Sequence, residues 1–205
     1  MATPRGEGRI QEDLAKRQTV TREVLLSGLT DLMFDRYAGD NTTQLEVWQK
    51  LYFGPDGETI SLPSLNLMSF LSAHNTNSAP KRLYDKRKFK DICNACLSYV
   101  SITPATLQLL RDGAPIKFGR FDGDVDALSG CYIHRSVARL DKGIPNPKVR
   151  PVLPLPWDLA FRLTILPNSE VNEQLVLNLF ESGGLAIGLG TFRGVFGKFH
   201  VAQWR

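Results

Sequence analysis

The 205-residue chain has few cysteines, few histidines and no long apolar run, and each absence excludes a class of protein. Three cysteines are an odd number and give no disulfide framework, so a reducing compartment is expected. No stretch approaches the roughly eighteen apolar residues of a membrane span. Residues 1–8 also lack the apolar segment of a signal peptide. We therefore expect a cytoplasmic protein without a membrane partner.

The excess of positive over negative charge is also small, because the formal net charge at pH 7 is only +4. A balance this small does not by itself indicate nucleic-acid binding, for which the clustering of cations matters more. The sequence holds no Walker A motif, since no Gly-Lys-Ser/Thr follows its glycines. A Rossmann fingerprint does not fit either, because the glycines follow an expected helix rather than a strand. No cofactor is expected.

What is present is enough apolar material for a sizeable core, with 42% hydrophobic residues. Residues 1–20 are polar and charged, and we expect them to form a flexible N-terminal segment. The remainder, residues 21–205, is expected to form a single α+β domain. A basic insertion around residues 74–105 would interrupt it.

Periodicity predicts the order of elements along the chain. Core strands are expected at 24–34, 131–140, 158–166 and 198–204, and a Pro-Asp-Gly turn at 55–57 predicts a hairpin. Helices are expected after Pro63 with Ser64 as the cap, over residues 86–99, and from a cap at residues 168–169. This order predicts an α+β fold with helices on one face of a mostly antiparallel sheet. A ferredoxin-like β-α-β-β-α-β unit with insertions is the nearest plan.

The most informative stretch is residues 183–201, which hold six glycines and three phenylalanines around Arg193 and Lys198. A glycine-rich turn between helix and strand brings backbone N–H groups close to a ligand, and the two cations add positive charge. We call residues 188–197 the glycine loop. A phosphate backbone suits this chemistry, with Gly188, Gly190, Arg193, Gly197 and Lys198 as contacts. A tight structural connection is the alternative.

A second cluster, which we call the basic segment, spans residues 81–90. Six of its ten residues are cations: Lys81, Arg82, Lys86, Arg87, Lys88 and Lys90. Tyr84 and Phe89 are interleaved with them, which suits a single strand whose phosphates pair with cations while its bases stack on rings. Cations at a helix start oppose the helix dipole, and a polyanion would compensate them. A solvated helix start is the alternative.

Arg135 and Arg139 lie at alternate positions of the expected strand at 131–140, so they share one face of it. We expect them to track nucleic acid along the sheet.

Cysteine and histidine spacing allows two weaker interpretations. Cys93, Cys96, Cys131 and His134 have the residue types and spacing of a Cys₃His zinc site, although the first two fall on the apolar face of an expected helix. His134 could instead serve as the base of a metal-independent ribonuclease. Asp122, Asp124 and Asp126 alternate and could bind a cation, but an exposed loop explains them more simply. The favoured interpretation has neither a catalytic residue nor a metal.

Two resemblances arise from these residues. The run from Gly188-Leu189-Gly190 to Gly197 is similar to the glycine-rich loop of the RAMP superfamily, the ferredoxin-like, RNA-binding subunits of CRISPR effector complexes. Four further segments resemble a family of small phage-borne proteins: residues 28–30, 62–67, 150–157 and 187–201. The chain departs from that family at Gly194, where proline is common. The resemblances imply a RAMP-type fold, self-assembly along a strand, and a host-cytoplasmic location if the protein is phage-encoded.

The leading hypothesis is a non-catalytic protein that binds single-stranded RNA or DNA, as a homo-oligomer or as a subunit of a nucleoprotein complex. The first alternative is an endoribonuclease that uses His134. The second is a phage protein that mimics or binds a CRISPR effector subunit. Binding requires the basic segment, cleavage requires a histidine, and mimicry requires neither to touch nucleic acid.

Overall fold

A computed structural model describes residues 18–40, 42–139 and 145–205, so most of the expected N-terminal segment lies outside the described residues. The larger of its two sheets has eight strands in the order β13-β1-β12-β6-β4-β3, with β5 also paired to β12 and β7 to β6. Their bounds are β1 Val20–Gly28, β3 Tyr52–Phe53, β4 Ile60–Pro63, β5 Val100–Thr103, β6 Thr106–Arg111, β7 Ala114–Pro115, β12 Asp158–Ile165 and β13 Phe199–Trp204.

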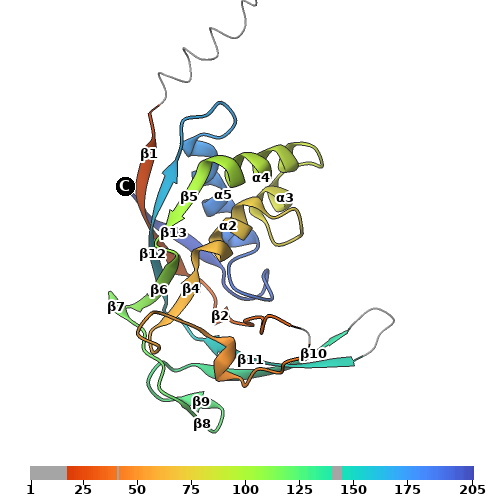
Figure 1. The fold of residues 1–205 in the computed structure, drawn as a ribbon, viewed down its shortest axis with the longest axis vertical. Coiled ribbons are helices and arrows are strands. Elements are labelled where there is room, and N and C mark those ends of the chain that lie inside the picture. Colours follow the sequence, from red (N-terminus) through yellow and green to blue (C-terminus); the bar gives the residue numbers. More distant parts are fainter. Residues whose placement is uncertain (1–17, 41, 140–144) are drawn as a thin grey trace, which may run out of the picture.

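The α-helices of the described residues cover one face of this sheet (Figure 1), and they are α2 Ser64–Ser72, α3 Ala79–Leu83, α4 Lys88–Tyr99 and α5 Glu173–Ala186. The chain runs from β1 through α2–α4 to β5 and β6, then through β12 and α5 to β13. In the sheet, β1 lies between β13 and β12, and β12 pairs with both β5 and β6. This is the ferredoxin-like plan that the sequence predicts, with its second strand divided into β5 and β6.

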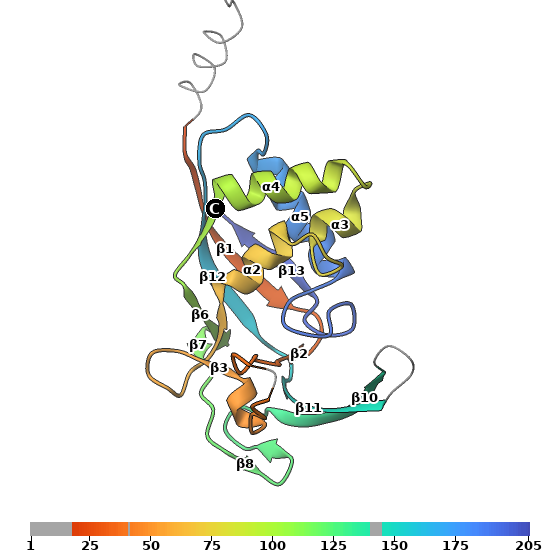
Figure 2. The same ribbon diagram turned by 45° about the vertical axis from the view of Figure 1, so that its right-hand side comes forward.

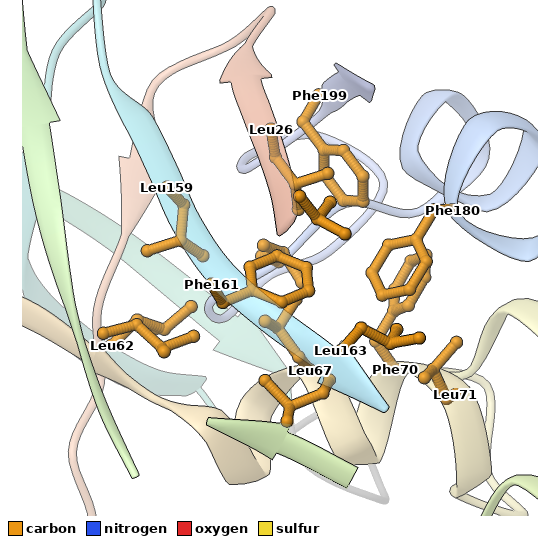
Figure 3. Packing of buried hydrophobic residues seen from close by; sticks show 14 of the residues in the cluster. Leu26, Leu62, Leu67, Phe70, Leu71, Leu159, Phe161, Leu163, Phe180 and Phe199 are labelled. Atoms are coloured by element: carbon orange, nitrogen blue, oxygen red, sulfur yellow. The ribbon is translucent and has the colours of Figure 1, made fainter. Parts of the chain in front are cut away.

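Strand β12 shows why the sheet forms its core on one side. Leu159, Phe161, Leu163 and Ile165 are buried, and Ala160 and Arg162 between them are exposed. Because successive side chains of a strand point to opposite faces, the buried four all face the helices. Figure 3 shows Phe161 and Leu163 directed toward Phe70 and Phe180 of the helical layer. The predicted alternation is confirmed.

Aromatic rings join the helices to the sheet. The ring centroids of Phe70 and Phe180 lie 5.6 Å apart, those of Phe161 and Phe180 5.8 Å, and those of Phe70 and Phe199 5.5 Å. Such aromatic pairs stabilise a core beyond the area they bury. The cluster holds α5 against β13, and so anchors both ends of the glycine loop.

The smaller sheet has five strands in the order β2-β11-β10-β9-β8. Their bounds are β2 Leu32–Met33, β8 Phe121–Asp122, β9 Val125–Asp126, β10 Tyr132–Arg139 and β11 Pro145–Leu153. Strands β10 and β11 form a hairpin that extends away from the helices (Figure 2). A short 3₁₀ helix, η1 (Trp48–Lys50), is joined to the small sheet by Lys50, which donates to the Val149 carbonyl of β11 at 2.6 Å. Among the described residues, no helix is both long enough and apolar enough to cross a membrane.

The expected single strand at 24–34 is wrong. Strand β1 ends at Gly28, where the Gly28 amide donates to the Trp157 carbonyl at 2.8 Å. The Trp157 indole then donates to the Thr30 carbonyl at 2.9 Å, and β2 pairs with β11 instead. A buried tryptophan from a distant segment therefore diverts the chain from one sheet to the other.

Two expected helix caps are also wrong. Helix α2 begins at Ser64, but no side chain caps it. Helix α5 begins at Glu173, and Asn172 caps it by accepting from the Leu175 amide at 2.9 Å. Asn168 accepts from the Glu170 and Val171 amides and forms a turn before the helix. Asn168 and Asn172 both carry the side-chain acceptor of a cap, so local sequence does not distinguish them.

Candidate nucleic-acid interface

The basic segment forms α3, a turn and the first residues of α4. Ser78 caps α3, since its hydroxyl accepts from the Lys81 amide. Asp85 accepts from the Lys88 amide at 3.1 Å and so supports the start of α4. The expected helix at 86–99 is confirmed as α4, whereas α3 lies where a loop was expected. Lys81 and Arg82 therefore lie in the last turn of α3, whereas Lys86, Arg87, Lys88 and Lys90 lie at or just before the start of α4.

All six cations of the basic segment are exposed, and none forms a salt bridge with another described residue. By contrast, several cations elsewhere in the described chain are paired, for example Arg22 with Glu173 at 2.6 Å and Arg162 with Glu23 at 2.8 Å. Unpaired like charges at a helix start repel one another and oppose the dipole. The basic segment is therefore a concentrated, uncompensated positive surface.

The aromatic rings of the basic segment are less available than the sequence suggests. Phe89 is 7% exposed and belongs to the core, which corrects its expected role as a base-stacking platform. Tyr84 is half-buried, with its hydroxyl accepting from Asn178 at 3.2 Å and the Lys88 ammonium 5.0 Å from its ring centroid. Lys81 lies similarly, 5.7 Å from the Phe89 centroid. The rings hold two of the cations in place.

The glycine loop connects α5 to β13, and the backbone at its two ends, residues 188–189 and 197, lies in close contact. The Leu189 amide donates to the Gly197 carbonyl at 2.8 Å, and the Gly197 amide donates to the Asp31 carbonyl at 2.7 Å. Gly197 has φ +73°, and a Cβ there would collide with the Leu189 backbone. Gly188, with φ +73°, is held equally close to the Gly197 backbone. At these two positions a close backbone approach explains the glycine.

Other N–H groups of the loop are also used within the protein. The Gly190 amide donates to the Asn66 side chain at 3.1 Å, the Thr191 amide to the Met33 carbonyl at 3.0 Å, and the Gly194 amide to the Ile187 carbonyl at 2.6 Å. The Lys198 amide donates to the Thr30 hydroxyl at 3.0 Å. These groups cannot donate to a phosphate without leaving their partners. The loop positions side chains rather than offering a cradle of amides.

Arg193 fastens the loop to the helical layer. Its guanidinium donates to the Gly190 carbonyl at 3.2 Å, to the Asn66 side chain at 3.1 Å and carbonyl at 3.3 Å, and to the Asn77 carbonyl. Burial lowers the pKa of Arg193 to about 10, so the group stays charged at neutral pH. Asn66 is a partner that the sequence does not reveal, because no local pattern connects residues 127 positions apart.

The tip of the loop lies between the basic segment and the β10–β11 hairpin. Arg193 reaches Asn77, just before α3, and the Phe196 ring meets the His134 ring of β10 edge-on at 5.5 Å. Phe192 is 55% exposed, has φ +53° and lies 6.0 Å from Phe196. A left-handed conformation is costly for a phenylalanine, so the surrounding loop must hold Phe192 there. Phe192 offers the ring that Phe89 does not.

Of the predicted hairpin contacts, Arg135 is exposed and paired with Asp124 through two bonds of 2.6 and 2.8 Å. The side chain of Arg139, the last residue of β10, lies outside the described part of the structure. Both residues belong to the hairpin of the small sheet and not to the large ferredoxin-like sheet. They therefore lie along the hairpin and not on the face of the large sheet.

The four candidate zinc ligands do not come together. Among the described residues, no group of three or more cysteine, histidine, aspartate or glutamate side chains could hold a metal ion. Cys93 and Cys96 are buried in α4, and Cys131 is buried beside the small sheet. Burial raises the pKa of Cys96 and of Cys131 to about 12, so both remain thiols. The Nδ1 atom of His134 is buried and has no hydrogen-bond partner in the described chain.

The open face of the large sheet differs from an aromatic RNA-binding platform. Strands β1 and β12 pair Thr21 with Thr164 and Glu23 with Arg162 on that face. Sheets that bind RNA on this face stack bases on aromatic side chains. The outward positions of β1 and β12 in the described chain hold none. The basic segment, the loop tip and the hairpin together form the stronger candidate surface.

Comparison with solved structures supports this fold. The chain is similar to a chain in the cryo-EM structure of the Type III-B Cmr-beta complex bound to cognate target RNA. The similarity covers 97% of this chain and 64% of the other, with a TM-score of 0.51 and 11% sequence identity. It confirms the predicted ferredoxin-like α+β fold. Neither a family model nor a curated protein matches the sequence.

Proposed function

We propose that this protein binds single-stranded RNA without cleaving it, as a subunit of a nucleoprotein assembly. The observation that carries the proposal is the basic segment, whose six exposed cations have no acidic partner in the described chain. A phosphate backbone supplies the missing negative charge. RNA is favoured over DNA because the structurally similar chain belongs to a complex bound to target RNA.

In this proposal the strand passes from the basic insertion, over the loop tip, to the hairpin. Lys81, Arg82, Lys86, Arg87, Lys88 and Lys90 neutralise phosphates, and Arg139 and Lys198 extend the positive track. Arg135 joins this track by exchanging its Asp124 partner for a phosphate. Phe192 offers an exposed ring to bases, and the half-buried Tyr84 offers a smaller ring surface beside Lys88. Arg193 and the glycines at 188, 190 and 197 hold the loop tip in position. Self-assembly of copies along the strand would extend the same track.

The test is a titration of a labelled 20-nucleotide RNA, the same sequence as DNA, and the RNA duplex, each at 50 and 200 mM salt. Each phosphate contact on a single strand contributes about 0.7 to the salt slope, so six contacts predict a slope of roughly −4. Binding should fall roughly 300-fold over this range. Single-stranded RNA should bind most tightly. No binding, or binding that is indifferent to salt, would contradict the proposal.

A further inference from the structure

A cleft of about 760 Å³ lies between η1, the β3–β4 turn and residues 117–128. It shares no lining residue with the basic segment or the glycine loop, and in Figure 1 strands β8 and β9 lie at the end of the molecule opposite α3 and α4. The volume falls within the range that binds small molecules. Its lining includes Trp48, Phe53, Phe118, Phe121, Leu128 and Arg120.

Aromatic rings form much of this cleft. Phe118 lies at the centre of a cluster, with its ring centroid 5.8 Å from that of Phe53 and 5.2 Å from that of Phe121. Trp48 is 49% exposed and Leu128 is 65% exposed, although both are large apolar side chains. Exposed apolar surface gathered in a concave site indicates a ligand with a flat, apolar face.

One side of the cleft is rigid because Asp126 organises it. The buried Asp126 carboxylate accepts from the amides of Gly119, Arg120, Leu128 and Ser129 and from the Ser129 hydroxyl. Burial alone would raise the pKa of Asp126, but these hydrogen bonds outweigh it and lower that pKa. The expected solvated acidic loop is therefore wrong for Asp126. The segment that carries Arg120, Phe121 and Leu128 is held in place before any ligand arrives.

The charges at the cleft indicate an anionic group on the ligand. Lys117 is already shared between Asp56 at 2.9 Å and Glu58 at 3.3 Å. Arg120 is exposed and has no ion-pair partner in the described chain. Glu58 also lines the cleft, but it is paired with Lys117, which leaves Arg120 as the unpaired charge among the lining residues. Aromatic side chains and a guanidinium in one cleft match a planar ring that carries a phosphate, since a guanidinium binds phosphate with a fork of N–H groups.

We propose that this cleft binds one nucleotide, with its base against Trp48 and Phe121 and its phosphate on Arg120. The nucleotide can be free in solution or can belong to a strand, and both sources share this chemistry. The inference does not depend on the proposed RNA-binding surface, which lies on other residues.

The probes are the four nucleoside 5′-monophosphates and their nucleosides, measured by calorimetry and by tryptophan fluorescence. Wild-type protein should bind at least one monophosphate more tightly than its nucleoside. Arg120→Ala should reduce monophosphate affinity tenfold or more and leave the nucleoside unchanged. Trp48→Ala should weaken both, by roughly five- to hundredfold, because stacking on the indole is lost. Circular dichroism confirms that each variant is folded, as expected for substitutions at exposed positions.

Binding of a 20-nucleotide RNA distinguishes a free nucleotide from a nucleotide that belongs to a strand. If the cleft holds a nucleotide of a strand, Trp48→Ala weakens RNA binding and monophosphate competes with it. If the ligand is free nucleotide, RNA affinity is unchanged while monophosphate affinity falls. Lys86→Ala/Arg87→Ala/Lys90→Ala should keep full monophosphate binding, so failure of one proposal does not imply failure of the other. Absence of monophosphate binding at millimolar concentration, or binding that both cleft variants retain, would overturn the inference.

Discussion

Replacing Lys86, Arg87 and Lys90 together with alanine should weaken single-stranded RNA binding roughly 50-fold at 0.15 M salt. These side chains are exposed and unpaired within the described chain, so their charge is available to phosphates. Losing three contacts should also reduce the magnitude of the salt slope by about 2, because each contact on a single strand contributes about 0.7. Folding stability should be unchanged or slightly higher, since repulsion at the start of α4 is relieved.

A matched variant separates this local effect from net charge. Arg22→Ala/Arg162→Ala/Arg205→Ala also removes three positive charges, but from the region of β1, β12 and the C-terminus. Arg22 and Arg162 are already paired with Glu173 and Glu23. This control should retain wild-type affinity within about twofold. Equal losses in the two triple variants, measured by fluorescence anisotropy, would show that the basic segment has no special role.

The second large effect concerns the glycine loop. Gly197→Ala should destabilise the protein by more than about 4 kcal/mol, because a left-handed backbone is combined with a collision against Leu189. Gly194 is the matched control, with φ +96° and no atom within 4 Å of the place that an alanine Cβ would take. Gly194→Ala should cost only about 1–2 kcal/mol, the cost of the backbone conformation. Urea unfolding followed by tryptophan fluorescence measures both free energies.

The comparison tests what the glycines are for. If the glycines serve only the close backbone contact within the loop, Gly194→Ala should retain RNA affinity. Gly197→Ala should then show its main effect on the free energy of unfolding. Similar small free-energy changes in both variants would contradict the close backbone contact. Loss of RNA affinity in a fully stable Gly197→Ala protein would instead support an amide cradle for phosphate.

Local patterns were sufficient to predict the central fold. One face of β12 is buried, so apolar and polar residues alternate along it, and this alternation can be recognised from the residues of the strand alone. The helix α4 is visible for the same reason, since Ile92, Cys93 and Cys96 recur at helical spacing and are buried. The order of such elements is enough to indicate a ferredoxin-like plan, because few topologies fit it.

Contacts between distant segments could not be predicted from those patterns. Trp157 ends β1 by bonding to backbone more than a hundred residues earlier. Arg193 looks like a ligand contact in the sequence, yet it bonds to Asn66 and Asn77 in the fold. Phe89 lies among exposed cations in the sequence, but its helical position turns it into the core. In each case the partner is set by tertiary packing.

The same limit applies to the candidate sites. The cations at 81–90 are recognisable because they lie within ten residues of sequence. The cleft beside η1 combines Trp48 and Phe53 with Phe118 and Phe121, from two segments far apart in the sequence. Asp126 could not be distinguished from Asp122 and Asp124 by spacing. Only the fold shows that five donors from neighbouring residues converge on it.

The most direct test of the proposed RNA surface is photo-crosslinking of a 4-thiouridine-containing RNA, with the crosslinked peptides identified by mass spectrometry. The proposed path predicts crosslinks to peptides that contain Tyr84 and Phe192, since the two rings flank the route from the basic segment to the hairpin. The basic-segment triple variant should lose them. Crosslinks confined to the open face of β1 and β12, unaffected by that variant, would contradict the account.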